Sequence, residues 1–243
     1  MNKIDFRAFN EDIYKYAPRP EPMSTAMPVW FKNIRSHVSH PNNLEQNDVF
    51  SNYGQLEHAL TIKRCPPVQQ VINMGYVIRT HCDIAVECDR EKDILSFNWQ
   101  GDEFNAIETH TRAQVQSSPI EGFAQSQKIF KWMNPWFINT SPGYSCLFTA
   151  PQYQDLPWIA LSGVVQTDKW HEVNFPFIYN GPDGRSVIRA GTPIAQVIPF
   201  KRETHISSVS FVSKSELKSW KRRTSMFFSK AYRKVMDKAM KFK

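Results

Sequence analysis

The amino-acid sequence predicts a mostly β protein, a single β-barrel or sandwich with one short internal helix and a basic α-helix at its C-terminal end. Many short apolar segments of strand length are separated by Pro, Gly and Asn, a pattern typical of sandwiches and barrels. The chain has 243 residues, 41% of them hydrophobic and 13% aromatic, which is enough for a sizeable core in one domain. Basic residues concentrate after residue 213, in a segment with helical periodicity.

Residues 1–57 are expected to form an extended, proline-rich N-terminal arm. Four prolines lie between residues 18 and 28, and residues 37–48 are polar and rich in turn-forming types. Such an arm is expected to cross the surface of a β-rich body, to which we assign residues 58–212.

The body is predicted to begin with a short helix and a long strand. The helix lies in CPPVQQVINMGY, with prolines in its first turn and Gly75 at its end. Apolar and polar side chains then alternate through residues 76–88, as expected for a half-buried strand. The turn DREKD and the apolar segment ILSFNW predict a hairpin with this strand.

The rest of the body is predicted to consist of short strands joined by turns. The strand candidates are NAIETH, KIFKWM, WFINT, YSCLFTA, WIALSGVVQ, EVNFPFIY, SVIR and PIAQVIPF. Pro176 has no N–H to donate to a neighbouring strand, so its strand is expected to lie at a sheet edge or to carry a bulge there.

Residues 213–243 are predicted to form a basic amphipathic helix. Ser213 and Glu216 have the spacing of a capping box. Residues 214–243 hold 11 Lys and Arg against two acids, a net charge of +9, whereas the rest of the chain carries −2. Affinity for polyanions is therefore expected to belong to this tail. Its candidate contact residues are Trp220, Lys221, Arg222, Arg223, Lys230, Arg233 and Lys234.

Three interpretations of the helix remain open. Its apolar stripe can pack on the body or on a neighbouring subunit, leaving the lysines solvated. Its charge also suits nucleic acid, or else a membrane surface or an acidic protein. No known DNA- or RNA-binding motif is present, so base-specific recognition is not predicted.

The sequence predicts no metal site, no cofactor and no catalytic residue. His81 and Cys82 are neighbours in a predicted strand and would point to opposite faces. Cys65 is the nearest candidate for a nucleophile, but its apolar surroundings favour a buried, inert thiol. No GxSxG elbow, P-loop or dinucleotide fingerprint occurs.

The sequence also suggests where the protein acts. The four cysteines form no CxxC pair and are typical of a reducing cytosol. The start of the chain does not have the pattern of a signal peptide, and the longest apolar runs have strand length, so no transmembrane segment is predicted.

Residues 142–200 resemble the dUTPase and dCTP deaminase family. GVVQTDKWHEVNFPFIYN and IRAGTPIAQVIPF are similar to its third and fourth motifs, at about the same spacing, and PGYSCLF weakly resembles its phosphate-contacting segment. The resemblance implies a β-barrel that is usually trimeric, with nucleotide bound between subunits. It also implies that Ser145 faces phosphate and that Asp168 and Gln196 belong to the motifs. With Trp170, whose ring lies one position after that of the family's stacking tyrosine, these are the candidate ligand-binding residues.

The resemblance breaks down at the reaction centre. Gln166 occupies the position where the family has the acid that positions the attacking water, and a glutamine cannot act as a general base. Lys169 occupies the position of the family's sugar-stacking tyrosine, and His171 occupies the position of the glycine that follows it. Tyr144 occupies the position of the expected arginine. The family's fold is therefore implied more strongly than its reaction.

A second resemblance covers most of the chain. PVWFK, RCPPVQQVINMGY, NPWF and GTPIAQVIPFKR are similar to segments of uncharacterised proteins from T4-like marine cyanophages and some bacteria. This resemblance implies a phage-type protein, located in the cytoplasm of an infected cell or in the virion, and it implies no activity.

Three functions are compatible with these observations, and the question of catalysis stays open. The leading hypothesis is a non-catalytic, homo-oligomeric β-barrel protein that binds a partner or nucleic acid, or assembles, through its basic helix. The alternatives are an enzyme that binds or hydrolyses pyrimidine nucleotides, with Asp168 or Glu172 in place of the missing acid, and a structural protein of the virion.

Overall fold

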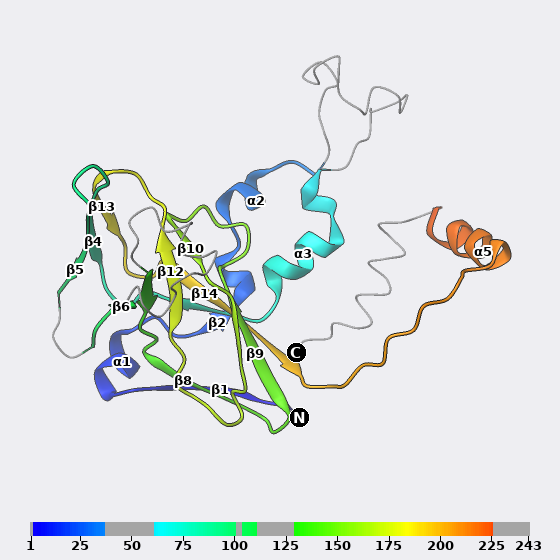
Figure 1. The fold of residues 1–243 in the computed structure, drawn as a ribbon, viewed down its shortest axis with the longest axis horizontal. Coiled ribbons are helices and arrows are strands. Elements are labelled where there is room, and N and C mark those ends of the chain that lie inside the picture. The colour runs from blue at the N-terminus through cyan, green and yellow to red at the C-terminus, as the bar shows by residue number, and fades with distance from the viewer. Residues whose placement is uncertain (1, 37–60, 101–103, 111–128, 226–243) are drawn as a thin grey trace, which may run out of the picture. The chain divides into compact units, whose positions relative to one another are not determined.

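The computed structural model describes residues 2–36, 61–100, 104–110 and 129–225, with side chains as far as residue 220 (Figure 1). The chain divides into two compact units. The first comprises Met1–Ala26 and Asn73–Glu203, and the second comprises Met27–Ile72 and Thr204–Lys243.

The first unit contains all the strands that the structure describes, and the protein is mostly β, as predicted. In chain order, the strands are β1 (Ile4–Ala8), β2 (Glu21–Pro22), β3 (Tyr76–Arg79), β4 (Ile84–Asp89), β5 (Ile94–Trp99), β6 (Ile107–His110), β7 (Ile129–Trp132), β8 (Trp136–Thr140), β9 (Tyr144–Thr149), β10 (Trp158–Ala160), β11 (Gly163–Val165), β12 (Phe175–Tyr179), β13 (Gly184–Ile188) and β14 (Pro193–Lys201). The same unit carries helix α1 (Glu11–Tyr16) and the 3-10 helix η1 (Met23–Ala26).

The strands form antiparallel sheets. The largest sheet has the order β11-β9-β14-β3-β2, and a second has the order β10-β12-β7-β6. A three-stranded sheet has the order β13-β4-β5, and β1 pairs with β8. The predicted hairpin is confirmed, because β4 pairs with β5 from Ile84↔Trp99 to Asp89↔Ile94.

The core of the first unit is aromatic at its centre. Phe177 is fully buried and stacks on Trp132 with ring centroids 4.6 Å apart. Trp158 packs edge-on against Trp132 at 5.1 Å, and Phe130 lies 5.8 Å from Phe177. Apolar residues of several sheets belong to the same buried cluster, so the sheets share one core.

The prediction of one long strand over residues 76–88 is wrong, because regular strand structure ends after β3 and the chain enters a different sheet at β4. Thr80 N–H donates to the carbonyl of Thr192 at 2.9 Å. Asp83 accepts from the Ala190 N–H at 2.7 Å and from the Arg189 guanidinium at 2.8 Å. These bonds to a distant turn hold the break, and nothing in the local alternation of residues indicates them.

The segment WIALSGVVQ is likewise divided. It supplies β10 to the four-stranded sheet and β11 to the five-stranded sheet. Between them, Leu161 N–H donates to the carbonyl of Pro176 at 2.8 Å.

The prediction that Pro176 lies in an edge strand is wrong, because its strand β12 lies between β10 and β7. The N and C=O of a strand residue face the same neighbour. The carbonyl of Pro176 accepts from the N–H of Leu161, which follows the end of β10. The nitrogen of Pro176 therefore also faces the β10 side of the sheet. The β10 register stops at Phe177, and Pro176 therefore interrupts no ladder bond.

Residues 2–36 contain more regular structure than the extended arm that is expected over residues 1–57. β1 pairs with β8 over five residues, from Ile4↔Thr140 to Ala8↔Trp136. Asn10 caps α1, since its side chain accepts from the Ile13 N–H at 2.8 Å. Residues 37–57 of this arm lie outside the described residues.

The second unit contributes helices. Its elements are α2 (Val29–Asn33), η5 (Ile62–Arg64), α3 (Pro66–Asn73), whose last residue belongs to the first unit, and α5 (Lys214–Ser225). Lys63 joins two of these segments, because its ammonium donates to the carbonyls of Lys32 and Ile34 at 2.7 and 3.0 Å.

Two helix predictions are confirmed in detail. α3 carries prolines in its first turn, and Gly75 follows it with a φ of +73°. At the start of α5, the Ser213 N–H donates to the Glu216 carboxylate at 2.9 Å, and the Glu216 N–H donates to the Ser213 hydroxyl at 3.2 Å. This is the reciprocal capping box that the sequence predicts. Among the helices of the described residues, none has the length and apolar character needed to cross a bilayer.

Candidate functional site

The site is built around the loop of residues 166–172, which follows β11. Asp168 in this loop forms a two-bond ion pair with Arg202, which follows β14. Arg202 Nη1 lies 2.9 Å from Asp168 Oδ1, and Nη2 lies 2.5 Å from Oδ2. The Asp168 side chain is only 7% exposed. A bidentate pair of this kind is both strong and geometrically restrictive.

Both members of the pair form further hydrogen bonds with their surroundings. Gly143 N–H donates to Asp168 Oδ2 at 2.9 Å. Arg202 Nη1 also donates to the Ser145 hydroxyl at 3.0 Å and to the Tyr144 carbonyl at 2.5 Å. The cluster of Asp168, Arg202, Ser145 and Gly143, which we call the clamp, thus fixes the loop to the turn between β8 and β9.

The clamp sets the ionisation of Asp168. The hydrogen bonds from Arg202, assisted by the Gly143 N–H and opposed by desolvation, lower the pKa of Asp168 to about 2. Asp168 raises the pKa of Arg202 in return. A carboxylate with so low a pKa is a poor proton acceptor at neutral pH. Ser145 is 1% exposed, which leaves no surface for a phosphate group to reach.

The clamp predicts a specific loss of stability in acid. Because the folded-state pKa of Asp168 lies below the ordinary value of 3.8, the folded state favours the ionised form, and this contribution disappears as the pH falls from about 3.8 to about 2. Asp168→Asn is expected to show a smaller decline of the free energy of unfolding over this interval, measured by urea denaturation at each pH.

The matched control for this measurement is Asp155→Asn, because Asp155 is exposed. It should keep the acid dependence of the wild type. Equal acid dependence in the wild type and in Asp168→Asn would show that the clamp does not stabilise the folded state.

Trp170 projects from the same loop and is 65% exposed. Its indole N–H donates to the carbonyl of Glu172, and its backbone N–H donates to the Gln166 carbonyl at 2.9 Å. The loop is also tied to β8, where Ile138 N–H donates to the His171 carbonyl at 2.9 Å. The structure therefore presents an aromatic ring to solvent in a fixed orientation.

Gln196 is separate from the clamp. Its side chain is fully buried, where it accepts from the Gln152 N–H at 3.1 Å and donates to the Met74 carbonyl at 2.8 Å. In the β14–β9 register Gln196 lies opposite Thr149, whereas Ser145 lies opposite Phe200, four residues further along the strand. Gln196 thus bonds to backbone groups of neighbouring segments.

The residues predicted to contact a partner lie in and after α5. Trp220 is 55% exposed. Lys221, Arg222 and Arg223 belong to the helix, but their side chains are not described. The remaining candidates, Lys230, Arg233 and Lys234, lie outside the described residues.

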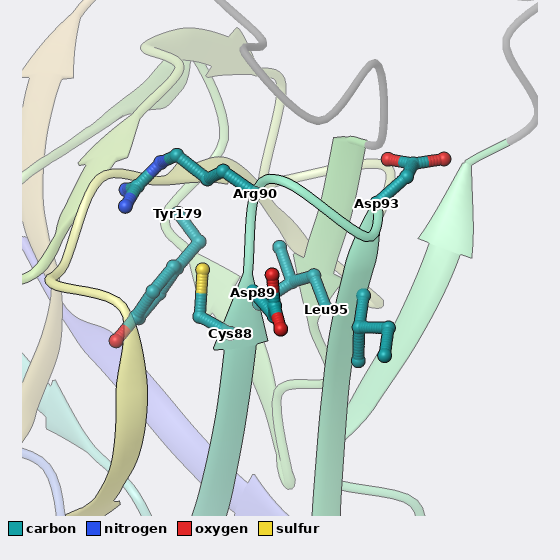
Figure 2. A pocket seen from close by; sticks show the side chains of 7 residues that line it. Cys88, Asp89, Arg90, Asp93, Leu95 and Tyr179 are labelled. Carbon is teal, nitrogen blue, oxygen red and sulfur yellow. The ribbon is translucent and has the colours of Figure 1, made fainter.

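A hollow lies beside the turn between β4 and β5, away from the clamp in the fold. Figure 2 shows the Cys88 thiol between the ring of Tyr179 and the Leu95 side chain. The lining residues are Cys88, Asp89, Arg90, Asp93, Ile94, Leu95 and Tyr179. An adjoining open depression of about 540 Å³ also includes Asp183 and Arg185.

The hollow and the adjoining depression contain two ion pairs and a thiol with a raised pKa. Arg90 and Asp183 lie 2.7 Å apart, and Lys92 and Asp89 also lie 2.7 Å apart. Burial, together with the hydrogen bond to Asp183, raises the pKa of Cys88. A protonated thiol next to a carboxylate is a poor nucleophile.

No three His, Cys, Asp or Glu side chains within the described ranges are placed to share a metal ion. Burial lowers the pKa of His81, and burial together with the nearby Asp83 raises the pKa of Cys82 to about 11. The raised pKa of Cys82 disfavours the thiolate that metal binding by this residue would require.

The structure unites Ser145 and Asp168 through Arg202, a residue that the sequence interpretation did not select. Asp168 and Arg202 are 34 positions apart. The only local signal is a pair of basic residues, Lys201 and Arg202, after the predicted strand PIAQVIPF, and such a pair is too common to indicate a partner.

Comparisons with known proteins find similarity to solved structures. No protein-family model matches the chain, and no curated protein matches it. Among solved structures, a mutant dUTPase from phage phi11 of S. aureus aligns with a TM-score of 0.37 and 11% sequence identity, over 88% of this chain and 99% of that one. A similarity of this size does not establish a common fold.

Proposed function

We propose that the protein is a non-catalytic binding or assembly protein, in which a β body supports a basic C-terminal segment that contacts a polyanion. The observation that carries this proposal is the state of Asp168, the acid that the family resemblance singles out. Both of its oxygens are bonded within the clamp, and its pKa is about 2. Gln166 occupies the position of the expected base, so neither of these two motif positions holds a free carboxylate, and the exposed Glu172 is the remaining acid of the loop.

The charge distribution supports polyanion binding by the tail. Residues 214–243 carry +9 while the rest of the chain carries −2, so a polyanion is attracted to one end of the sequence. The capping box begins α5 immediately before this segment, and Trp220 supplies an exposed ring among the basic positions. Basic side chains around an aromatic ring suit nucleic acid, since phosphates pair with the charges and a base can stack on the ring.

The proposal also covers the closure of the sheets and the place where the protein acts. We infer that the sheets of the first unit close into one barrel, because β-strands from several sheets contribute to a single buried cluster. The phage resemblance favours a role in an infected cell or in the virion, and the presence or absence of the protein in purified particles separates these two.

Deletion of residues 214–243 tests the function directly. The truncated protein is expected to keep the circular dichroism spectrum of its β body and to lose binding to labelled single- or double-stranded DNA, measured by fluorescence anisotropy. For the whole chain, the logarithm of the binding constant should fall linearly with the logarithm of salt concentration, by about 0.9 for each duplex phosphate contacted.

Two substitution sets sharpen this test. Replacing Lys221, Arg222 and Arg223 with alanine should reduce both the affinity and the salt slope. Replacing the exposed Lys3 and Arg7 of β1 should change neither. Unchanged DNA binding by the truncated protein, or rapid turnover of dUTP or dCTP by the whole chain, would contradict the proposed function.

A further inference from the structure

An unprotected sheet edge lies along β5 (Ile94–Trp99), the outer strand of the three-stranded sheet (Figure 1). Within the described residues, the backbone of β5 pairs with β4 alone. Its six residues, ILSFNW, include no charged residue, no proline and no glycine. An antiparallel strand bonds to each neighbour through alternate residues, so about half of the N–H and C=O groups of β5 point to its unpaired side. Such an edge is a template for another strand.

The other sheet edges that the structure describes are protected. Natural sheets prevent pairing at their edges with charged side chains, proline or short strands. Charged side chains occur on three of these edges, at Arg185 in β13, Glu108 in β6, and Asp5 and Arg7 in β1. β2, β10 and β11 have only two or three residues each. The uncharged β8 is bonded on its second side, because the Ile138 N–H donates to the His171 carbonyl. β5 has none of these protections.

The two faces of β5 differ, with core-facing side chains at Leu95, Phe97 and Trp99 and solvent-facing side chains at Ile94, Ser96 and Asn98. Leu95 is buried, and the two aromatic residues pack against the same core cluster. Ser96 is half-buried and Asn98 is exposed. A strand that adds at this edge must therefore be apolar on one face and polar at the centre of the other.

A second copy of β5 meets this requirement. In an antiparallel pair centred on Phe97, this residue lies opposite its own copy. Leu95 of each chain then lies opposite Trp99 of the other, so large apolar side chains meet on the core face. Ser96 lies opposite Asn98, so a hydroxyl meets an amide on the solvent face. No like charges oppose each other, since the strand is uncharged. The strand is thus complementary to itself.

We propose that two copies of the protein pair through β5 about a two-fold axis. The β13-β4-β5 sheet of each copy then becomes half of one continuous six-stranded sheet. Such an interface is isologous, because the same edge serves on both chains. Pairing satisfies the main-chain groups on the unpaired side of β5 and leaves β13, with its Arg185, at both ends of the joined sheet. The interface uses the first unit alone and is separate from the basic segment 214–243.

Sedimentation of charged variants tests the pairing. The wild type is expected to sediment as a dimer in analytical ultracentrifugation. Ser96→Lys combined with Asn98→Lys places lysines opposite lysines across the two-fold axis and should raise the dimer dissociation constant at least about tenfold. Both positions face solvent, so the circular dichroism spectrum should stay unchanged. Ala85→Lys is the matched control and should leave the dimer intact, because Ala85 lies opposite Asn98 on the same face but in the interior strand β4.

Opposite charges identify the strand that β5 meets. Chains with Ser96→Lys and Asn98→Lys, mixed with chains carrying Ser96→Glu and Asn98→Glu, should form a mixed dimer, because each lysine then lies opposite a glutamate. A chain with Ser96→Glu and Asn98→Lys should pair with itself, since the two positions oppose each other in this register. A monomeric wild type, a dimer that survives the two lysines, or oppositely charged chains that fail to combine would overturn the proposal.

Deletion of residues 214–243 keeps this proposal apart from the proposed function. The truncated protein should remain a dimer while it loses binding to DNA. A truncated protein that is monomeric would assign self-association to the basic segment and would refute the role of β5. A truncated dimer that still binds DNA would support the pairing through β5 and contradict only the proposed function.

Discussion

Phe177→Ala is expected to lower the free energy of unfolding by about 3–5 kcal/mol. The Phe177 side chain is fully buried and stacks on Trp132, with ring centroids 4.6 Å apart and planes inclined by 18°. Phe97 also contacts it edge-on at 5.9 Å. Removing the ring leaves a cavity among large, rigid aromatic neighbours that cannot collapse to fill it, so the cost should lie at the upper end of the usual range for core truncations.

The measurement for Phe177→Ala is urea denaturation followed by tryptophan fluorescence, with Phe200→Ala as the matched control. Phe200 is 38% exposed, so the same substitution there removes much less buried surface and should cost far less. Equal costs at the two positions would mean that the aromatic centre does not dominate the stability of the body.

Gly75→Ala is expected to destabilise the fold by about 3 kcal/mol or more, because two unfavourable effects coincide there. The residue has a φ of +73°, in the left-handed region that side chains disfavour. An added Cβ would also lie 2.1 Å from the carbonyl oxygen of Val197. That carbonyl belongs to β14, at the point where Val197 pairs with Tyr76 of β3, so it cannot move without disturbing the sheet.

A second glycine separates the two effects. Gly191 has a φ of +83°, but a Cβ there would meet nothing within 4 Å. Gly191→Ala should therefore cost only the backbone strain, about 1–3 kcal/mol. Thermal unfolding of both variants measures the difference. If Gly191→Ala proved as damaging as Gly75→Ala, the contact with Val197 would not be the cause.

The clamp shows why the candidate site was only partly predictable. The resemblance to known motifs points to Asp168 and Ser145, and the structure brings them close, but as hydrogen-bonded parts of the clamp. Arg202, which joins them, has no local feature that distinguishes it from the chain's other basic residues. The same resemblance points to Gln196, yet the register of β14 places Gln196 four residues away from the position opposite Ser145.

The sequence by itself determined the features that depend on neighbouring residues. The strand segments, the hairpin at DREKD, the end of α3 near Gly75 and the capping box of α5 follow from side-chain alternation, turn chemistry and backbone bonds only a few positions apart. The separation of charge between the body and the tail is likewise a property of composition alone.

Only the tertiary structure decided which segments meet. The break between β3 and β4 depends on a turn more than 100 positions away, where Asp83 accepts from Ala190. Pro176 can lie in an interior strand because the paired part of β10 ends opposite Phe177. The low pKa of Asp168 depends on Arg202. Each of these contacts joins segments distant in sequence, and its geometry is set by strand register and sheet order, which local residue patterns do not encode.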